Sequence, residues 1–307
     1  MRILLTGGNG LLGRALKRVL AEERPPLQLD APGRAALDLT DQRAVRRHFA
    51  TERYDAVIHA AATVGGIRAN IERPTAFLAE NILMNTLVIE AAREAGIGSL
   101  LFLGSSCMYP KDLGKDLAET DLLTAPLEPT NEGYALAKIA GARHCEAVSR
   151  QYGLAYRTVV PCNLYGPDDH FDFERGHLVA AALRKVHEAK RDGARAVTIW
   201  GDGEARREFM YVDDLARFIL RWAGRLGELP PLINVGVGDD HSVNDYYRVA
   251  ADVVGYGGDF THDLAAPVGM RRKLMDVSQA HRLGWRAATP LAEGMRLAYQ
   301  GLLRSKS

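Results

Sequence analysis

Two short segments carry side chains that together could reduce a carbonyl group. Tyr134 and Lys138 are four residues apart, so on a helix they lie on one face, one turn from each other. We expect the Lys138 ammonium to lower the pKa of the Tyr134 phenol toward neutrality, because a nearby positive charge favours the phenolate. Such a phenol can give a proton to a carbonyl oxygen while a hydride reaches the carbon. Ser105, in the segment 104–110, is expected to hydrogen-bond the same oxygen.

Cys107 adds a group that carbonyl reduction alone does not need. Its thiol stands two residues after Ser105. A free cysteine is most often a buried apolar residue, and this is our interpretation of Cys145 and Cys162. A thiol becomes a useful base when a positive neighbour favours its thiolate form. Because Cys107 lies so close to a candidate catalytic serine, the sequence favours a chemical role for it.

The chain begins with a glycine pattern typical of dinucleotide binding. Gly7, Gly10 and Gly13 follow a short apolar segment and precede a helical one. Glycines at this spacing allow a tight turn and a close approach of a pyrophosphate, which sits at the N-terminus of the helix. The sequence therefore predicts a dinucleotide site at the start of the chain.

Local residues leave the choice between NAD and NADP open. Asp30 is expected at the end of the second strand, where a carboxylate would bind the ribose hydroxyls of NAD and repel a 2′-phosphate. Arg34 follows four residues later and could bind that phosphate instead. These two residues therefore favour NAD and NADP about equally.

Strand and helix patterns alternate through the first half of the chain and set where these residues lie. Strand-like apolar runs are predicted at residues 2–6, 27–30, 56–61, 100–103 and 156–160. Helical spacing is predicted at residues 11–22, 41–50, 77–95 and 134–152. This order predicts an α/β fold with a doubly wound parallel sheet of the Rossmann type, whose ligands bind at the carboxyl ends of the strands.

After Pro161 this alternation breaks. The elements predicted beyond it are a helix at 177–191, a strand at 197–200, a helix at 211–225 and a strand at 232–237. We therefore predict two domains. The dinucleotide-binding Rossmann domain takes residues 1–165 plus about 211–236, and a smaller α/β substrate-binding domain takes residues 166–210 plus about 237–307.

The composition argues against several classes of protein. The 307-residue chain has 39 Lys and Arg against 38 Asp and Glu, a net charge of +1, which speaks against nucleic acid or a membrane as a partner. Its three cysteines are widely spaced, which predicts neither a disulfide framework nor a metal site. No apolar run reaches the roughly 18 residues of a membrane span. The start MRILLTGGNG leaves no room for a signal peptide, so we expect a cytoplasmic protein.

Several longer motifs together resemble one known family. They are the segments AATVGGI at 61–67, GSSCMYP at 104–110, EPTNEGYALAK at 128–138, PCNLYGP at 161–167 and RKL at 272–274. The chain resembles the extended short-chain dehydrogenase/reductase family, and within it the enzymes that both epimerise and reduce GDP-4-keto-6-deoxy-mannose. The glycine pattern and the Tyr-x-x-x-Lys motif are shared by the whole family. The serine–cysteine motif joined to the Asn-Glu-x-Tyr motif is specific to this group.

The resemblance implies chemistry at three carbons of the sugar. A 4-keto group makes the hydrogens on C3 and C5 acidic, and inverting these carbons needs a base on one face and an acid on the other. By resemblance, Cys107 and His177 supply this pair, while Ser105 and Tyr134 stabilise the enolate oxygen. Hydride then passes to C4, with Tyr134 as the proton donor and Lys138 holding the nicotinamide ribose. The expected product is GDP-L-fucose.

The resemblance also assigns binding positions, and it favours NADP(H), with NAD(H) a close alternative. The positions expected to bind the cofactor are Gly7, Gly10, Leu11, Leu12, Gly13, Asp30, Arg34, Ala61, Lys138, Pro161, Asn163, Leu164 and His177. The positions expected to bind the GDP-sugar substrate are Val64, Ser106, Lys185, Trp200 and Arg207. Arginine can hold a diphosphate through a bidentate fork. One departure bears on the cofactor, because relatives that use NADPH commonly have an arginine in the position of Asn9.

Other functions stay open at this point. The chain could act on another NDP-4-keto sugar, as a reductase alone or as an epimerase alone, or it could be a catalytically silent nucleotide sensor with the same fold. The cysteine–histidine pair favours epimerisation, whereas the Ser–Tyr–Lys set favours reduction. The resemblance further implies a homodimer formed through the helices predicted at 77–95 and 134–152.

Overall fold

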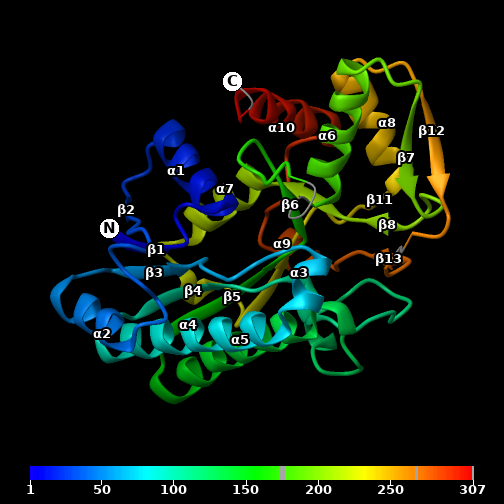
Figure 1. The fold of residues 1–307 in the computed structure, drawn as a ribbon. Helices are drawn as coiled ribbons and strands as arrows, with labels where there is room; N and C mark the ends of the chain where they lie inside the picture. The colour runs from blue at the N-terminus through cyan, green and yellow to red at the C-terminus, as the bar shows by residue number, and fades with distance from the viewer. Residues whose placement is uncertain (173–176, 267–268, 306–307) are drawn as a thin grey trace.

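The structure is a computed structural model that describes residues 1–172, 177–266 and 269–305. Its centre is a six-stranded sheet in the order β10-β5-β4-β3-β1-β2, in which all neighbouring strands are parallel (Figure 1). The strands are β1 (Arg2–Thr6), β2 (Gln28–Asp30), β3 (Ala56–His59), β4 (Ser99–Leu103), β5 (Ala155–Pro161) and β10 (Leu232–Val235). The predicted α/β fold with a parallel sheet is confirmed.

Helices cover both faces of this sheet. They are α1 (Leu11–Glu23), α2 (Gln42–Thr51), α3 (Ile67–Glu72), α4 (Pro74–Glu94), α5 (Glu132–Tyr152) and α7 (Val212–Trp222). α4 and α5 pack side by side on one face, with α2 against α4, and α1 packs on α7 at the other face (Figure 1). Strands β1, β3 and β4 are buried over most of their length, as parallel strands covered on both faces must be.

Local signals explain where these helices begin and end. Asp41 is the N-cap of α2, and its side chain accepts hydrogen bonds from the backbone of Arg43 and Ala44. α5 ends at Gly153, which adopts the left-handed conformation with φ 69°. α4 begins earlier than predicted, at Pro74, because proline lacks the N–H that would stay unpaired in a first turn.

After β5 the chain builds a smaller lobe around the helices α6 (Leu178–Arg191), α8 (Val243–Val254) and α10 (Leu291–Ser305). Its short strands are β6 (Asn163–Tyr165) paired with β9 (Phe209–Tyr211), β7 (Ala196–Trp200) paired with β12 (Asp259–Asp263), and β8 (Arg206–Arg207) paired with β11 (His241–Ser242) and β13 (Arg272–Lys273). Of these elements, α6 and β7 match the predicted helix and strand. Most of the other strands are two or three residues long, too short for a periodic pattern to reveal. β12 has five residues, but they are mostly polar and exposed, so they form no apolar run.

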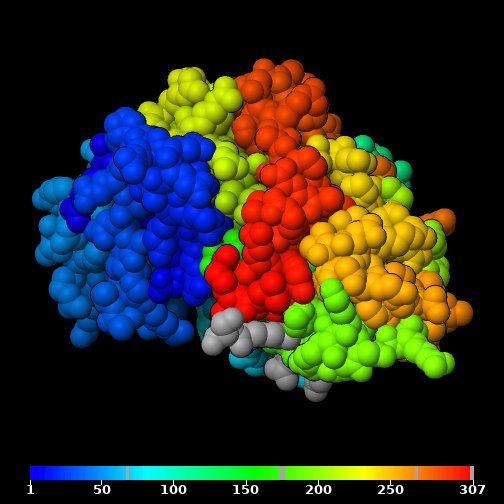
Figure 2. Space-filling view, turned by 90° about the horizontal axis from the view of Figure 1, so that it is seen from above, coloured from blue at the N-terminus to red at the C-terminus, as the bar shows by residue number. Residues whose placement is uncertain are grey.

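The described residues form two hydrophobic cores. The larger surrounds the six-stranded sheet, and the smaller lies among α6, α8 and α10. Met275, Val277 and Trp285 pack in the larger core, although the sequence analysis placed the segment 237–307 in the smaller domain. In Figure 2, α10 (red) lies between the blue N-terminal part and the yellow-to-orange residues of the smaller lobe. Within the described ranges, no helix combines the length and the apolar character that crossing a bilayer requires.

Candidate active site

The glycine turn lies where the carboxyl ends of β1 and β3 meet. Gly7 has φ +77°, and a Cβ atom at this position would lie 2.7 Å from the backbone nitrogen of Ala61. A Cβ atom on Gly13 would lie 2.3 Å from the Gly7 carbonyl oxygen, so the turn closes tightly on α1. α1 begins after Gly10 with no side-chain cap, which leaves its first N–H groups for another acceptor. This cradle fits a pyrophosphate.

The carboxylate expected to select NAD is engaged in a structural contact. One oxygen of Asp30 accepts hydrogen bonds from Arg2 Nη2 and from the Tyr54 hydroxyl, each at 2.7 Å. Arg34 has an 81% exposed side chain, and its ion pair with Asp38 spans 3.6 Å. An arginine so exposed can exchange this partner for a phosphate at little cost.

The serine–cysteine segment follows β4 and is held from two sides. It forms the 3₁₀ turn η1 (Ser106–Met108), in which the Cys107 N–H donates to Ser105 Oγ at 3.3 Å. The buried Tyr109 hydroxyl donates to Asn234 Oδ1 at 2.5 Å, which ties the turn to β10. On the other side η1 packs against α5. The serine and the cysteine are thereby fixed beside the helix that carries Tyr134.

Tyr134 and Lys138 share one face of α5, as their spacing predicts. Lys138 Nζ lies 5.8 Å from the centre of the Tyr134 ring and donates to the Leu103 carbonyl oxygen at 2.8 Å. The lysine is 1% exposed, and this burial lowers the pKa of its amine to about 7. The Ser105 side chain hydrogen-bonds Tyr134, so the three predicted groups form one cluster.

The predicted lowering of the Tyr134 pKa is wrong. Burial raises the pKa of the phenol above its usual value, the neighbouring Cys107 raises it further, and the hydrogen bond with Ser105 opposes this only in part. The physical reason is that Lys138 is itself deprived of water and donates to the Leu103 carbonyl rather than to the phenol. Tyr134 therefore keeps its proton at neutral pH, as a proton donor should.

Cys107 has two further polar neighbours. Asn131 Nδ2 donates to the Cys107 sulfur at 3.2 Å, and Lys273 Nζ lies 3.8 Å from it. Neither residue was among the predicted site residues. Lys273 comes from β13, 166 residues along the chain, and its signal in the sequence was the RKL motif at 272–274. Its ammonium places a positive charge beside the Cys107 sulfur.

Lys273 also affects the pKa of His177, the residue that the sequence analysis paired with Cys107. His177 is the N-cap residue of α6, and its side chain is accessible to solvent. The protein atoms around this imidazole displace part of its water and so lower its pKa, and the positive charges of Lys273 and His170 lower it further. The structure thus places Cys107 and His177 near the same ammonium group.

Three of the residues predicted to bind substrate belong to the smaller lobe. Lys185 Nζ on α6 lies 5.3 Å from the centre of the Trp200 ring, and burial lowers the pKa of this amine. Trp200 ends β7 and is 60% exposed, so its ring offers a face for stacking. Arg207 on β8 is more enclosed, and burial lowers its pKa. Together they offer cations and an aromatic ring.

The other predicted positions lie around the carboxyl ends of the strands. Pro161 ends β5, and Asn163 and Leu164 begin β6, where Asn163 Nδ2 donates to the Glu208 carbonyl oxygen at 3.1 Å. Those remaining are Leu11 at the start of α1, the exposed Val64, and Leu12 and Ser106, whose side chains are buried. Among the described residues, no three His, Cys, Asp or Glu side chains are grouped to hold a metal ion.

Comparison with known proteins agrees with this geometry. The profile of the NAD dependent epimerase/dehydratase family matches residues 3–236. The chain belongs to this family. The predicted membership of the extended short-chain dehydrogenase/reductases is thereby confirmed.

Its relatives include enzymes of GDP-sugar metabolism. The chain is 43% identical over 309 residues to the GDP-L-colitose synthase of Yersinia pseudotuberculosis, covering 100% of this chain and 99% of the relative. It is 42% identical over 313 residues to the GDP-L-fucose synthase of Escherichia coli K12, covering 99% and 97%. A solved GDP-mannoheptose C4 reductase from Campylobacter jejuni with NADP bound is 31% identical, with TM-score 0.89 and 98% of each chain covered. A GDP-L-fucose synthetase from Naegleria fowleri bound to NADP has TM-score 0.89 at 26% identity, covering 99% of this chain and 93% of that one.

The buried amine of Lys138 makes stability depend on pH. Its pKa of about 7 in the folded chain lies below the ordinary 10.5, so between these values the unfolded chain binds more protons. From pH 7 to pH 9.5, wild type should therefore gain roughly 3 kcal/mol of unfolding free energy relative to Lys138→Met. Urea denaturation of both proteins measures this, with Lys17→Met on the exposed side of α1 as the control. A wild-type advantage that does not grow with pH would contradict the lowered pKa.

Proposed function

We propose that the chain epimerises C3 and C5 of GDP-4-keto-6-deoxy-mannose and reduces C4 with NADPH to give GDP-L-fucose. One observation carries this proposal: Cys107, with the Lys273 ammonium 3.8 Å away, adjoins the cluster of Ser105, Tyr134 and Lys138. Carbonyl reduction needs the cluster but not the thiol, whereas epimerisation beside a carbonyl needs a base. The relative named GDP-L-fucose synthase, 42% identical over nearly the whole chain, supports the choice of substrate.

In this proposal the thiol and the imidazole work on opposite faces of the sugar. Cys107 takes a proton from a carbon beside the carbonyl, and His177 returns one from the other side. The charge left behind is delocalised onto O4, where Ser105 and Tyr134 donate hydrogen bonds to it. The lowered pKa of His177 helps its protonated form to give up the proton.

The same donors serve the reduction. When bound, the cofactor supplies the hydride that C4 receives. As O4 gains negative charge, Tyr134 gives it the phenolic proton that burial has retained. We assign Lys138 to the nicotinamide ribose, because its ammonium lies on the same face of α5 as the phenol.

The glycine turn fits a dinucleotide, and we propose NADP(H) as the cofactor. The backbone of residues 7–13 would hold the pyrophosphate, because side chains at Gly7 and Gly13 would clash with the turn. Asp30 is paired with Arg2, whereas the exposed Arg34 is available for the 2′-phosphate. The two solved relatives described with NADP support this choice.

A second candidate is the same chemistry on a different GDP-4-keto sugar. The relative named GDP-L-colitose synthase, at 43% identity, favours it. Turnover assays with each purified GDP-4-keto sugar separate the two candidates.

We further propose a cytoplasmic homodimer. α4 and α5 pack side by side, and apolar side chains remain exposed on them at Ile82, Leu83, Leu136 and Tyr152. A second copy of the same two helices would cover these side chains. Three free cysteines suit a reducing compartment.

Cys107→Ser tests the epimerisation step. The hydroxyl keeps the size of the thiol but is far too weak an acid to serve as a base. In deuterated water with substrate and no reduced cofactor, wild type should exchange deuterium into C3 and C5, read by NMR, and Cys107→Ser should lose this exchange. The variant should still reduce the unepimerised ketone slowly, since Ser105, Tyr134 and Lys138 are intact. Loss of the His177 side chain should instead leave exchange on one face and stop inversion.

Full exchange in Cys107→Ser would show that the thiol is not the base and has only a packing role. No exchange in wild type would show that the enzyme reduces C4 without epimerising the sugar.

Tyr134→Phe tests the reduction step. The change removes the phenolic proton and little else, so hydride transfer should slow by on the order of 10²–10⁴ while the affinity for reduced cofactor stays near wild type. Stopped-flow absorbance and fluorescence titration measure the two quantities. Tyr152→Phe, on the exposed end of the same helix, is the matched control. A variant that turns over at the wild-type rate would remove Tyr134 from the mechanism.

Arg34→Ala tests the choice of cofactor. Loss of a charged hydrogen bond to the 2′-phosphate should raise the KM for NADPH by about tenfold or more and leave the KM for NADH nearly unchanged. Arg43→Ala, an exposed arginine on α2, is the control. A wild-type enzyme that prefers NADH would overturn the proposal of NADP(H).

A further inference from the structure

Two short strands of the smaller lobe carry four cations in register. β8 consists of Arg206 and Arg207, and β13 of Arg272 and Lys273. The strands are parallel, with Arg206 opposite Arg272 and Arg207 opposite Lys273. Successive side chains of a strand point to opposite faces, so each opposed pair of cations shares one face of this small sheet. Like charges directly opposite repel, and an anion on the same face offsets that repulsion.

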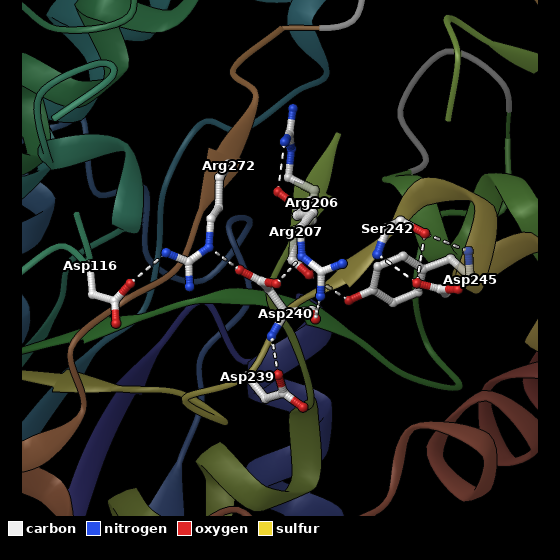
Figure 3. Close-up of polar contacts among 9 residues, drawn as sticks. Asp116, Arg206, Arg207, Asp239, Asp240, Ser242, Asp245 and Arg272 are labelled. Atoms are coloured by element: carbon white, nitrogen blue, oxygen red, sulfur yellow. Dashed lines mark hydrogen bonds and ion pairs between the residues drawn. The ribbon is translucent and has the colours of Figure 1, made fainter. Parts of the chain in front are cut away.

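Asp240 is that anion for Arg206 and Arg272 (Figure 3). Its side chain is 4% exposed, and its two oxygens accept hydrogen bonds from Arg206 Nε and, at 2.6 Å, from Arg272 Nε. Arg206 also donates to the Asp240 carbonyl oxygen at 2.5 Å, and Arg272 donates to Asp116 at 2.8 Å. Burial alone would raise the pKa of Asp240, but the two arginines hold it below its usual value. The carboxylate therefore stays charged and joins the two strands.

The other face of the sheet is directed to the candidate active site. The Arg207 side chain points away from the Asp240 carboxylate in Figure 3. Lys273, opposite Arg207 in the register, has its ammonium 3.8 Å from the Cys107 sulfur. Arg207 and Lys273 thus lie on the same face of the small sheet. In the proposed reaction this face would meet the substrate diphosphate and the Cys107 thiolate.

A second buried carboxylate secures the strands at their ends. Glu208, the residue after β8, is 1% exposed and accepts the backbone N–H groups of Gly238 at 2.9 Å and Met275 at 3.0 Å. Met275 lies two residues beyond Lys273, so this contact joins the segments that follow β8 and β13. The residues on either side of Arg207 are therefore both held in place: Arg206 by Asp240, and Glu208 by the backbone of Gly238 and Met275.

We infer that Asp240 is a positioning residue, which draws Arg206 and Arg272 together and thereby sets Arg207 and Lys273 for the substrate diphosphate and for Cys107. Strands of two residues share few hydrogen bonds, so without the carboxylate their cations would separate them. The identity of the substrate rests on the proposed function. The contact between Lys273 and Cys107 does not, and it gives an independent readout.

Asp240→Asn tests the inference, with Asp239→Asn as the matched control. The asparagine at 240 keeps the size but loses the charge, and its oxygen can accept from one arginine while its amide group faces the other. The exposed Asp239 accepts the Asp240 N–H through Oδ1, a contact that an asparagine can also make.

Three measurements follow on the folded proteins. Asp240→Asn should bind GDP about tenfold more weakly by calorimetry, and its fast-reacting thiol should be alkylated by iodoacetamide about threefold more slowly at pH 7. That thiol is Cys107, because Cys145 and Cys162 are buried. Affinity for reduced cofactor should not change. Asp239→Asn should equal wild type in all three measurements, and Asp240→Glu, which keeps the charge, should recover part of the loss.

A purely structural Asp240 would lower the unfolding midpoint but leave GDP affinity and thiol reactivity at wild-type values, and this result would overturn the inference. If Asp240→Asn does not fold, Arg272→Gln replaces it, since the pair of Arg206 and Asp240 then remains. This variant should weaken GDP binding and slow alkylation about twofold or more, and wild-type values would again overturn the inference. Failure of the proposed function would be seen in a different experiment, in which wild type would not turn over GDP-4-keto-6-deoxy-mannose.

Discussion

The buried amine of Lys138 is the contact on which the arrangement of the site depends. An amine without water needs an acceptor, and it finds the Leu103 carbonyl at the end of β4. This bond sets the position of α5 along the sheet. A second buried contact supports it, because Asn85 on α4 accepts a hydrogen bond from His59 Nε2 of β3 through Oδ1 and donates to the Ala137 carbonyl of α5 through Nδ2. Two helices and two strands are thus held together by polar groups that must be satisfied.

The same burial sets the acid–base character of the site. It raises the pKa of Tyr134 and lowers that of Lys138, so both groups are shifted toward their neutral forms. A phenol that keeps its proton and an amine near its titration point are suited to proton transfer at neutral pH. The positive charge beside Cys107 comes from another source, Lys273 of the smaller lobe. Helix α5 therefore carries the phenol, and the smaller lobe carries the positive charge beside the thiol.

The cations of β8 and β13 lie beside buried carboxylates for an electrostatic reason. Cations cannot be placed side by side on two-residue strands without anchors, and Asp240 and Glu208 are those anchors. Both carboxylates are buried. Their contacts are with the two strands and the segments that follow them, and Arg207 and Lys273 lie opposite each other in the register, with the Lys273 ammonium 3.8 Å from the Cys107 sulfur.

Periodicity and spacing along the chain determined the parallel α/β fold, the glycine turn and the shared face of Tyr134 and Lys138, because these depend on residues close in sequence. The tertiary structure decided what depends on packing. Lys273 reaches Cys107 from a strand too short to show a pattern. Asp30 is paired with a residue of a neighbouring strand. The direction of the Tyr134 pKa shift follows from how much water the folded chain removes from the phenol, and no spacing along a sequence measures that.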